Sequence, residues 1–263
     1  MRILKTVLKI SLALVLLLVL VVAGLALSLR ATLPEDTFDL QPVAASAADP
    51  RPVLIFGATR NTGYEVAKIL RARGQSVTAA VRASSDRSML APLGVDFVVA
   101  DAVDAQAVSA AVASNDFQAI VTTIACSRCE PPPDFLGNKN IIDAAKAQSV
   151  DRLVLITTVG AGDSYEAANL LSRYFLRDIL PMKTQAEDYL KASGVDYTII
   201  RPGGLRSNET SPTGGGVLTE DRSTLGFIHR ADVAELIVAA LDDERTRNRT
   251  FAALDPAIDS PWD

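Results

Sequence analysis

The sequence predicts an α/β fold built on a doubly wound parallel sheet, preceded by one transmembrane helix. Short apolar runs alternate with helical patterns from residue 53 onward, and this alternation is typical of βαβ units with right-handed crossovers. The first run, residues 53–56, is apolar throughout, as expected of a strand that is buried on both faces of a parallel sheet. At 263 residues the chain is long enough for one such domain and an appendage, but short for two.

The predicted elements follow one another through the domain. Strands are expected at residues 53–56, 76–81, 96–100, 119–124, 153–157 and 197–200. Helices are expected at residues 62–73, 104–113, 136–148 and 165–192, and Pro181 should break or kink the last of them. The tail is loop-rich up to residue 216, and its predicted elements are a strand at 227–229, a helix at 231–241 and a strand at 250–253. Such a tail is expected to cover the substrate side of the sheet.

The N-terminal stretch from residue 10 to residue 29 is apolar except for Ser11 and Ser28. Twenty helical residues, at a rise of about 1.5 Å each, span the roughly 30 Å hydrocarbon core of a bilayer. A cleaved secretory signal is the alternative, but its apolar part is usually only about 7–15 residues long. We therefore expect residues 1–30 to be a membrane anchor. Residues 31–51, rich in Pro, Ala and acids, are then a linker, and residues 52–263 form the domain.

The first predicted strand runs directly into GATRNTG and then into a helix. Gly57 permits a tight turn, Gly63 permits close packing of helix on strand, and the helix N-terminus presents N–H groups to a pyrophosphate. A plain strand-to-helix turn is the alternative, but the strand–loop–helix–strand context favours a Rossmann dinucleotide site. The predicted cofactor-binding residues of this loop are Gly57, Thr59, Arg60, Asn61, Thr62 and Gly63.

The end of the second strand bears on which nicotinamide dinucleotide binds. NAD-selective proteins place an Asp or Glu there to bind the ribose 2'-hydroxyl, whereas this chain has Arg82. Arg60 lies in the phosphate loop itself, and guanidinium groups suit a 2'-phosphate because they can bind it in a bidentate way. Either arginine could be a solvated surface charge. The missing carboxylate nevertheless favours NADP(H) over NAD(H).

Several segments together resemble one known family. They are GATRNTG, VRASSDR, DAVD at residues 101–104, DYTIIRPGGL and HRADVAEL. Over about residues 52–255 the chain resembles the atypical short-chain dehydrogenase/reductases with NAD(P)-binding NmrA-like domains. The resemblance implies that Asp101 and Ala102 line the adenine pocket and that Thr122 and Thr123 lie near the ribose. Related glycine patterns have Gly where Arg60 or Asn61 stands, but Asn tolerates a left-handed backbone, so the loop can still form.

In reductases of that superfamily a Tyr four residues before a Lys donates a proton to the carbonyl, and the Lys lowers the pKa of the Tyr. The segment KTQAE resembles the family's KxxAE and so identifies Lys183, which also contacts the cofactor. Ile179 stands where the Tyr is expected. Tyr165 or Tyr174 could act from a displaced position, although packing is their more ordinary role. Two threonines that end the fifth strand could bind a substrate oxygen, so the candidate catalytic residues are Lys183, Thr157 and Thr158.

Three further features leave alternatives open. Cys126 and Cys129 form a CxxC motif after the fourth strand, but residues 130–133, EPPP, predict an extended loop where a thioredoxin-type motif would open a helix. A loop brace or two inert thiols are therefore favoured over dithiol chemistry. His229 is expected to orient or pack, with Asp232 in the first turn of the following helix. Residues 211–216 are either a lid over the substrate or an idle surface loop.

Composition narrows the functions further. Acidic and basic residues are scattered along the chain and leave a net charge of -5, so a nucleic-acid partner is not expected. One His and two Cys cannot convincingly supply a four-ligand zinc site, and no metal is expected.

Three cationic residues precede the apolar stretch and only Arg30 closely follows it, which places the domain outside the cytoplasm. A nicotinamide cofactor instead requires the cytosol or an organelle interior, and we favour that side.

Two functions fit these observations. The first is an NADPH-dependent oxidoreductase, tethered to a membrane, that acts on a small or lipophilic carbonyl or a quinone-like substrate. The second is a non-catalytic NADPH-binding redox sensor, or an assembly factor that docks to a membrane complex. The absent Tyr motivates the second. The sequence predicts neither the substrate nor the oligomeric state.

Overall fold

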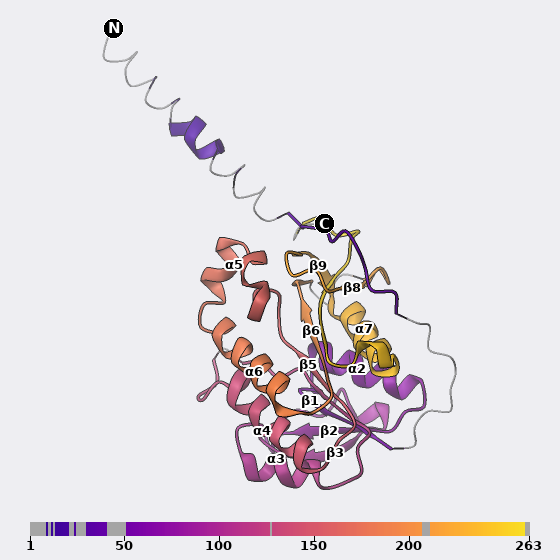
Figure 1. Ribbon diagram of the computed structural model, residues 1–263. Coiled ribbons are helices and arrows are strands. Elements are labelled where there is room, and N and C mark those ends of the chain that lie inside the picture. Colours follow the sequence, from indigo (N-terminus) through magenta and orange to yellow (C-terminus); the bar gives the residue numbers. More distant parts are fainter. Residues whose placement is uncertain are drawn as a thin grey trace.

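The computed structural model describes residues 9, 12, 14–20, 24, 30–40, 51–126, 128–206 and 211–260. Within these residues one eight-stranded sheet has the order β3-β2-β1-β4-β5-β6-β10-β8 (Figure 1). Neighbouring strands are parallel except for β8, which is antiparallel to β10. The strand order reverses between β1 and β4. In doubly wound sheets, dinucleotides bind in the crevice outside the carboxyl ends of the strands at such a reversal.

The elements have the following bounds. The strands of the sheet are β1 (Val53–Phe56), β2 (Val77–Val81), β3 (Asp96–Val99), β4 (Ala119–Thr122), β5 (Leu153–Ile156), β6 (Tyr197–Pro202), β8 (Val217–Thr219) and β10 (Arg249–Leu254). A separate parallel pair consists of β7 (Gly204–Arg206) and β9 (Phe227–His229). The helices are α2 (Asn61–Ala72), α3 (Ala105–Val112), α4 (Pro133–Ala147), α5 (Leu170–Phe175), α6 (Leu180–Ser193) and α7 (Arg230–Asp242), with short 3-10 helices η1 (Ala91–Leu93), η2 (Gly162–Ala167) and η3 (Glu244–Thr246).

Helices cover both faces of the sheet. On one face α2 and α7 pack together and contribute Val66, Leu70 and Ile237 to a core with the alternate residues of the strands. On the other face α3, α4 and α6 form the second core (Figure 1). Every residue of β1, β2, β4 and β5 is buried, which explains why these strands are apolar apart from Thr78 and Thr122. Each fully buried aliphatic side chain contributes about 1.5–3 kcal/mol to folding.

The predicted long helix at residues 165–192 is divided into η2, α5 and α6. Pro181 lies in the first turn of α6, where its missing N–H costs nothing, so the predicted break is confirmed. Helix α4 begins at Pro133, three residues earlier than predicted, for the same reason. The predicted extended loop after the cysteines is correspondingly shorter. The tail was expected to be loop-rich up to residue 216. Strand β7 lies within that stretch, and strand β8 begins directly after it.

The first part of the predicted linker lies against the domain. The Ala31 N–H donates to Asp259 O at 2.9 Å, and Thr32 forms an antiparallel bridge with Leu225. Phe38 packs on Phe251 with ring centroids 4.9 Å apart. These contacts make residues 31–40 an extension of the domain surface beside β8. Residues 41–50 lie outside the described residues.

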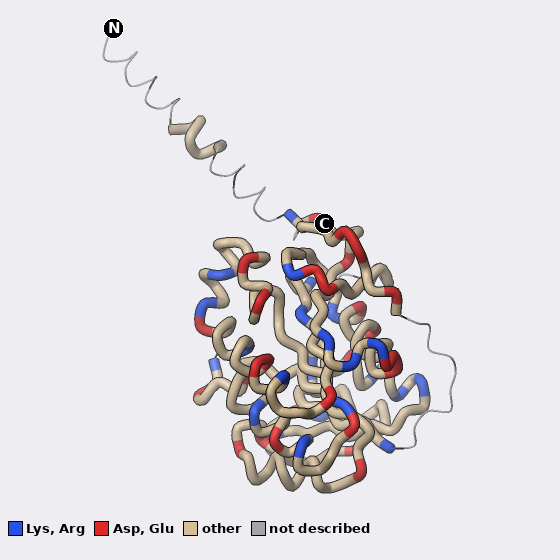
Figure 2. Tube along the Cα trace, viewed as in Figure 1, with Lys and Arg blue, Asp and Glu red and all other residues tan. Residues whose placement is uncertain are grey.

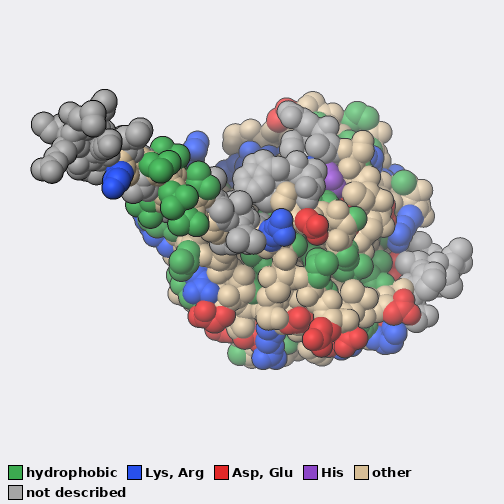
Figure 3. All heavy atoms as spheres, turned by 90° about the horizontal axis from the view of Figure 1, so that it is seen from above, with side chains coloured by type: hydrophobic (Ala, Val, Ile, Leu, Met, Phe, Trp, Pro, Cys, Tyr) green, Lys and Arg blue, Asp and Glu red, His purple; other side chains and the backbone are tan. Residues whose placement is uncertain are grey.

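The predicted membrane anchor is described only in part. Of residues 10–29, residues 12, 14–20 and 24 are described, and they are helical. The described leucines and valines of this segment are exposed, Leu18 to 63% (green atoms at the left of Figure 3). Within the described part of the chain, no helix has both the length and the apolar character needed to cross a bilayer. The remainder of the predicted anchor lies outside the described residues.

Candidate dinucleotide and substrate site

The predicted cofactor residues gather at one edge of the sheet. Phe56, the last residue of β1, is in register with Ala80 of β2 on one side and with Thr122 of β4 on the other. Because these strands are parallel, the segments that follow them emerge side by side. This edge therefore carries the loop after β1, Arg82 after β2, the turn after β3 and the threonines at the end of β4.

The two glycines of the loop are required by close packing. Gly57 has a φ of 90°, and a Cβ there would lie 2.6 Å from Thr123 Oγ1. A Cβ on Gly63 would lie 2.3 Å from Gly57 O, so the first turn of α2 rests directly on the loop backbone. A side chain at Gly63 would displace main chain, whereas one at Gly57 would clash with the Thr123 hydroxyl and strain the left-handed backbone. Helix α2 begins directly at the end of the loop without a side-chain cap, so N–H groups of its first turn are available to a pyrophosphate.

The remaining residues of the loop differ in conformation and in exposure. Asn61 has a φ of 54°, so the left-handed conformation that Asn tolerates is the one it adopts. Thr62 is buried, Thr59 is half-buried and Arg60 is exposed. Arg82 is exposed as well, and within the described residues neither guanidinium has a hydrogen bond or ion pair. Elsewhere acidic and basic residues are interspersed along the trace (Figure 2).

The threonines at the end of β4 hold the site together. Thr123 Oγ1 donates to Phe56 O at 3.3 Å, which ties β4 to the start of the phosphate loop. Thr122 is completely buried, and its Oγ1 donates to Asn138 Oδ1 of α4 at 2.7 Å. Asn138 Nδ2 in turn donates to Asp134 O at 2.8 Å. Both hydroxyls are therefore engaged with protein groups at the edge where a ribose was expected.

The turn after β3 packs against α4. Asp101 is exposed, and its Oδ1 accepts the N–H of Val103 at 3.2 Å. Ala102 is buried, and its carbonyl accepts Asn140 Nδ2 at 2.9 Å. A Cβ on Gly137 would lie 3.0 Å from Ala102 Cβ, so α4 approaches this turn closely. The structure thus places the two predicted adenine residues at the outer end of the same edge.

Lys183 lies on α6 and reaches α4. Its Nζ is 3.2 Å from Asp134 Oδ1, and the two side chains are 9% and 0% exposed. The contact is an ion pair without hydrogen-bond alignment, because Asp134 Oδ1 has no hydrogen-bond partner in the described residues. Sequence reasoning missed Asp134. The polar pair at positions 134 and 138, four residues apart on a mostly apolar helix, is the pattern that could have revealed it.

A second buried ion pair lies under the predicted catalytic threonines. Arg201 Nε and one terminal nitrogen bind the Glu187 carboxylate at 3.0 and 2.6 Å, and the side chains are 3% and 0% exposed. Thr157 Oγ1 donates to the same carboxylate at 2.6 Å. The Thr157 hydroxyl is thus occupied by Glu187. Sequence reasoning missed this pair, although an Arg inside an apolar strand requires a buried carboxylate nearby.

Asp163 completes this network at its exposed end. Its Oδ1 accepts Arg201 at 2.6 Å, and its Oδ2 lies 3.1 Å from Arg222 Nε. Partial burial alone would raise the pKa of Asp163, but the hydrogen bond and charge of Arg201 outweigh it and lower the pKa. Burial would likewise lower the pKa of Arg201, and Glu187 and Asp163 together raise it instead. Both groups stay ionised near neutral pH.

The position of the missing tyrosine is occupied by Ile179, the residue that precedes α6. Tyr165 is 48% exposed with Arg173 stacked on its ring at 4.5 Å, and Tyr174 is 62% exposed. Both tyrosines are exposed, and the ring of Tyr174 packs edge-on against Phe175 with centroids 5.6 Å apart. Thr158 is half-buried, and its Oγ1 donates to Pro202 O at 3.4 Å. The described residues place no tyrosine hydroxyl in the buried network beside Lys183.

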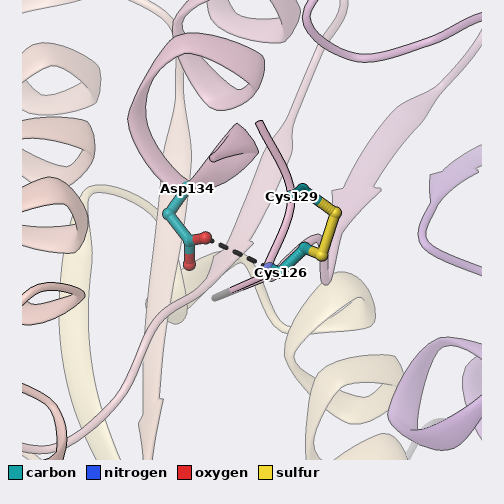
Figure 4. Close-up of a disulfide and its surroundings, with 3 residues drawn as sticks. All are labelled: Cys126, Cys129 and Asp134. Atoms are coloured by element: carbon teal, nitrogen blue, oxygen red, sulfur yellow. Dashed lines mark hydrogen bonds between the residues drawn. A yellow bond between two sulfur atoms is a disulfide. The ribbon is translucent and has the colours of Figure 1, made fainter. Parts of the chain in front are cut away.

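The cysteines form a disulfide between β4 and α4 (Figure 4). The Cys126 N–H donates to Asp134 Oδ2 at 3.2 Å, and the Cys129 N–H donates to Cys126 O at 3.3 Å. Helix α4 begins four residues after Cys129, so the motif lies in the loop that precedes the helix. Of the alternatives left open by the sequence, this geometry is that of a loop brace, and the brace contacts the buried partner of Lys183.

The tail folds over the other side of the same edge. His229 ends β9 and is 5% exposed, so it is a buried residue, as a packing or orienting role requires. Asp232 lies in the first turn of α7 as predicted, and its carboxylate also accepts the N–H groups of Thr213 and Gly214 at 3.2 and 3.0 Å. The predicted lid segment is thereby fastened to α7 in this structure.

A cavity of about 340 Å³ opens on the sheet beside β6 and β10. Its walls carry both signs of charge, among them Arg201, Arg249 and Glu220. None of the predicted cofactor residues lines it. The cavity is therefore separate from the dinucleotide edge, and its Arg201 is already satisfied by two carboxylates.

The strand order and the glycine loop define a dinucleotide-binding protein of the Rossmann class. Comparison with known proteins makes the assignment specific, because residues 57–244 match the family described as NAD(P)H-binding. An uncharacterized chloroplastic protein of Arabidopsis thaliana is 32% identical over 220 residues, which cover 77% of this chain and 76% of that protein. The chain therefore belongs to the NAD(P)H-binding, NmrA-like family of atypical short-chain dehydrogenase/reductases, as the sequence segments implied.

Two further relatives are reductases. Sanguinarine reductase of Eschscholzia californica is 41% identical over 122 residues, which cover 45% of this chain and 43% of that enzyme. The solved structure of ChuY, an anaerobillin reductase from Escherichia coli O157:H7, superposes with a TM-score of 0.71 at 29% identity. That superposition covers 79% of this chain and 98% of ChuY. By their names, these two relatives are reductases of sanguinarine and of anaerobillin.

Proposed function

We propose that the chain is an NADPH-dependent oxidoreductase, tethered to a membrane, that reduces a small or lipophilic carbonyl or quinone-like compound. The observation that carries the proposal is the sheet edge at the β1–β4 reversal, where the glycine loop and the α2 N-terminus meet the strand ends. Hydride transfer from a nicotinamide requires the protein mainly to orient cofactor and substrate. The reductases among the relatives support this choice of reaction.

The preference for NADPH rests on Arg60 and Arg82. Both are exposed at the edge where the adenosine ribose is expected. Among the described residues, no carboxylate forms an ion pair with either guanidinium. Replacing either by Ala is expected to raise the Kd of NADPH by about tenfold, the effect of losing one charge-assisted hydrogen bond, and to leave the Kd of NADH unchanged. Arg73→Ala, at the opposite end of α2, is the matched control and should change neither constant. Equal losses for both cofactors would contradict the 2'-phosphate assignment.

The membrane tether is proposed from residues 10–29 and from the contacts of the chain that follows them. The Ala31–Asp259 and Thr32–Leu225 contacts fix the point at which the chain reaches the domain. The loop that contains Leu225 is joined to η2 by the Arg222–Asp163 ion pair, and η2 leads into α5. Helix α5 exposes Leu170 to 83% and Phe175 to 72%, an apolar surface that suits a lipid boundary (upper left of Figure 1).

The side of the membrane is proposed from the chemistry of the cofactor. The positive charges before the apolar stretch favour an external domain, whereas NADPH is held in the cytosol or in an organelle interior. We place the domain on the side that contains the cofactor. Protease digestion of sealed membrane vesicles tests this directly. The domain is expected to be digested in vesicles that expose the cytosolic or interior face and to be protected in vesicles of the opposite orientation.

Turnover tests the proposed reaction. Full-length protein in lipid nanodiscs is expected to consume NADPH with at least one member of a panel of enones, aldehydes and quinones. Lys183→Met should lower kcat/KM by at least about 100-fold if the lysine orients the cofactor and the reacting carbonyl. Lys146→Met, an exposed lysine at the far end of α4, is the control and should leave turnover unchanged.

One observation favours a second candidate, a non-catalytic NADPH-binding sensor or assembly factor. Ile179 replaces the proton-donating tyrosine, and the Thr157 hydroxyl is bound to Glu187. Tight NADPH binding together with no NADPH consumption across the panel would favour this candidate. A partner membrane protein recovered with the wild-type chain, and lost on addition of NADPH or NADP, would then identify the signal that the protein reports.

A further inference from the structure

The disulfide lies in the loop between β4 and α4, where the Cys126 N–H meets the buried carboxylate of Asp134. Both cysteines are half-buried, and Ala125, Arg128 and Glu130 around them are exposed, so the sulfur atoms lie in a surface loop that another protein or a small thiol can approach. Arg128 stands between the cysteines and places a positive charge in this loop. A nearby guanidinium favours the thiolate form of a cysteine, the form that takes part in exchange.

The disulfide is coupled to Lys183 through a single carboxylate. Asp134 is completely buried, and among the described residues the Cys126 N–H is the only hydrogen-bond donor to its carboxylate (Figure 4). Its other oxygen faces Lys183 at 3.2 Å without a hydrogen bond. A buried carboxylate needs such donors, so the position of the Cys126 amide affects how Asp134 and Lys183 are held. The Cys126–Cys129 turn is what fixes that amide.

We propose that Cys126 and Cys129 form a thiol–disulfide exchange site whose redox state sets the affinity of the chain for NADPH. The inference rests on the proposed function, in which Lys183 contacts the cofactor. With the disulfide closed, the Cys126 N–H holds Asp134, and Asp134 holds Lys183 in the site. With the disulfide open, the turn is released, Asp134 loses its donor, and the carboxylate no longer holds Lys183 in the position from which it reaches the cofactor.

The reaction partner is a dithiol reductant, such as a small redox protein with its own pair of cysteines. Its first thiolate attacks one sulfur of the pair, the S–S bond breaks, and the other cysteine leaves as a thiolate and takes up a proton. The second thiol of the reductant then attacks the mixed disulfide and releases the reduced chain. The chain gains two electrons and two protons, and the reductant becomes a disulfide. Such reductants belong to the compartments that also hold NADPH.

Cofactor titration of the full-length protein in nanodiscs tests the proposal. The Kd of NADPH is measured before and after treatment with dithiothreitol, and maleimide labelling with mass measurement counts the free thiols in each sample. Reduction is expected to raise the Kd by about tenfold, the size of effect expected when a hydrogen bond to a charged group is lost. The Cys126→Ser/Cys129→Ser variant should bind like the reduced wild-type protein and should not respond to dithiothreitol. Asp134→Asn should bind weakly in both states.

Three results would overturn the proposal or its basis. An unchanged Kd in a sample with two free thiols would overturn it, because the disulfide would then be a passive brace. A double serine variant that binds like the oxidised wild-type protein would overturn it as well, even if the native disulfide resists reduction. Absence of NADPH binding in both redox states would instead contradict the proposed function from which the inference starts.

Discussion

Because α2 approaches the phosphate loop most closely at Gly63, a substitution at this residue is a direct test of the predicted dinucleotide site. In Gly63→Ala the new Cβ would lie 2.3 Å from Gly57 O and 2.7 Å from Thr123 Oγ1. The first contact is with main chain, so no rotamer change relieves it. The start of α2 must then move by roughly 1 Å to reach ordinary van der Waals separation. Overpacking of this kind costs about 1–3 kcal/mol of folding free energy.

The same displacement moves the N–H groups that should bind the pyrophosphate. Losing one or two hydrogen bonds to a charged group raises the Kd of NADPH by at least about tenfold. Isothermal titration calorimetry of the wild-type and variant proteins measures this, with thermal unfolding in parallel. A Gly63→Ala variant that binds NADPH with wild-type affinity would refute the assignment of this loop as the dinucleotide site.

Gly74 provides the matched control, because it follows the same helix at its other end. It has a φ of 81°, and a Cβ there would meet nothing within 4 Å. Gly74→Ala therefore carries a backbone strain of about 1–2 kcal/mol without any clash. The variant should lose stability much as Gly63→Ala does, yet keep the wild-type Kd for NADPH. The comparison separates loss of binding from general destabilisation.

Three further predictions concern stability. Arg201→Met leaves the Glu187 carboxylate buried without its partner and should lower the free energy of unfolding by about 3–5 kcal/mol in urea titrations, whereas a loss below about 1 kcal/mol would show that the pair is dispensable. The lowered pKa of Asp163 means that its stabilisation is complete above the ordinary carboxyl pKa and is lost as the pH falls through the lowered value. Asp163→Asn should therefore be less stable than wild type by about 0.5–1 kcal/mol at neutral pH and equally stable once the wild-type carboxyl is protonated, and a difference that persists in acid would contradict the ion-pair explanation. Asn61→Gly should keep wild-type stability, because Gly accepts the left-handed backbone, whereas Asn61→Val should cost about 1–2 kcal/mol; equal melting temperatures for the two variants would argue against the observed loop conformation.

The strands of the sheet could be predicted closely because burial on both faces leaves a plain signal. Residues 53–56 and 227–229 are strands with the predicted bounds, and the other predicted strands differ by one or two residues at their ends. The glycine loop was equally predictable, since each required residue stands next to the others in the chain. The conformation of the loop at residues 57–63 could therefore be predicted from residues that are adjacent in the sequence.

The parts that escaped prediction depend on contacts between distant residues. Phe38 lies in a segment of linker-like composition, and only its packing on Phe251 makes that segment part of the domain. The Asp134–Lys183 and Glu187–Arg201 pairs each join two different elements, so a polar residue within one element could suggest a buried charge but could not identify its partner. Strands β7 and β8 are three residues long, too short for alternation to be recognised. Such features become visible only when the fold has been assembled.

The β1–β4 edge is proposed to bind NADPH through the loop at residues 57–63. A crystal structure of the full chain with NADPH tests it most directly. The pyrophosphate is predicted over Gly57 and the N-terminus of α2, with the 2'-phosphate bound by Arg60 and Arg82 and the nicotinamide ribose within hydrogen-bonding distance of Lys183. Cofactor bound instead in the charged cavity beside β6 and β10, or a 2'-phosphate that contacts neither arginine, would contradict the account.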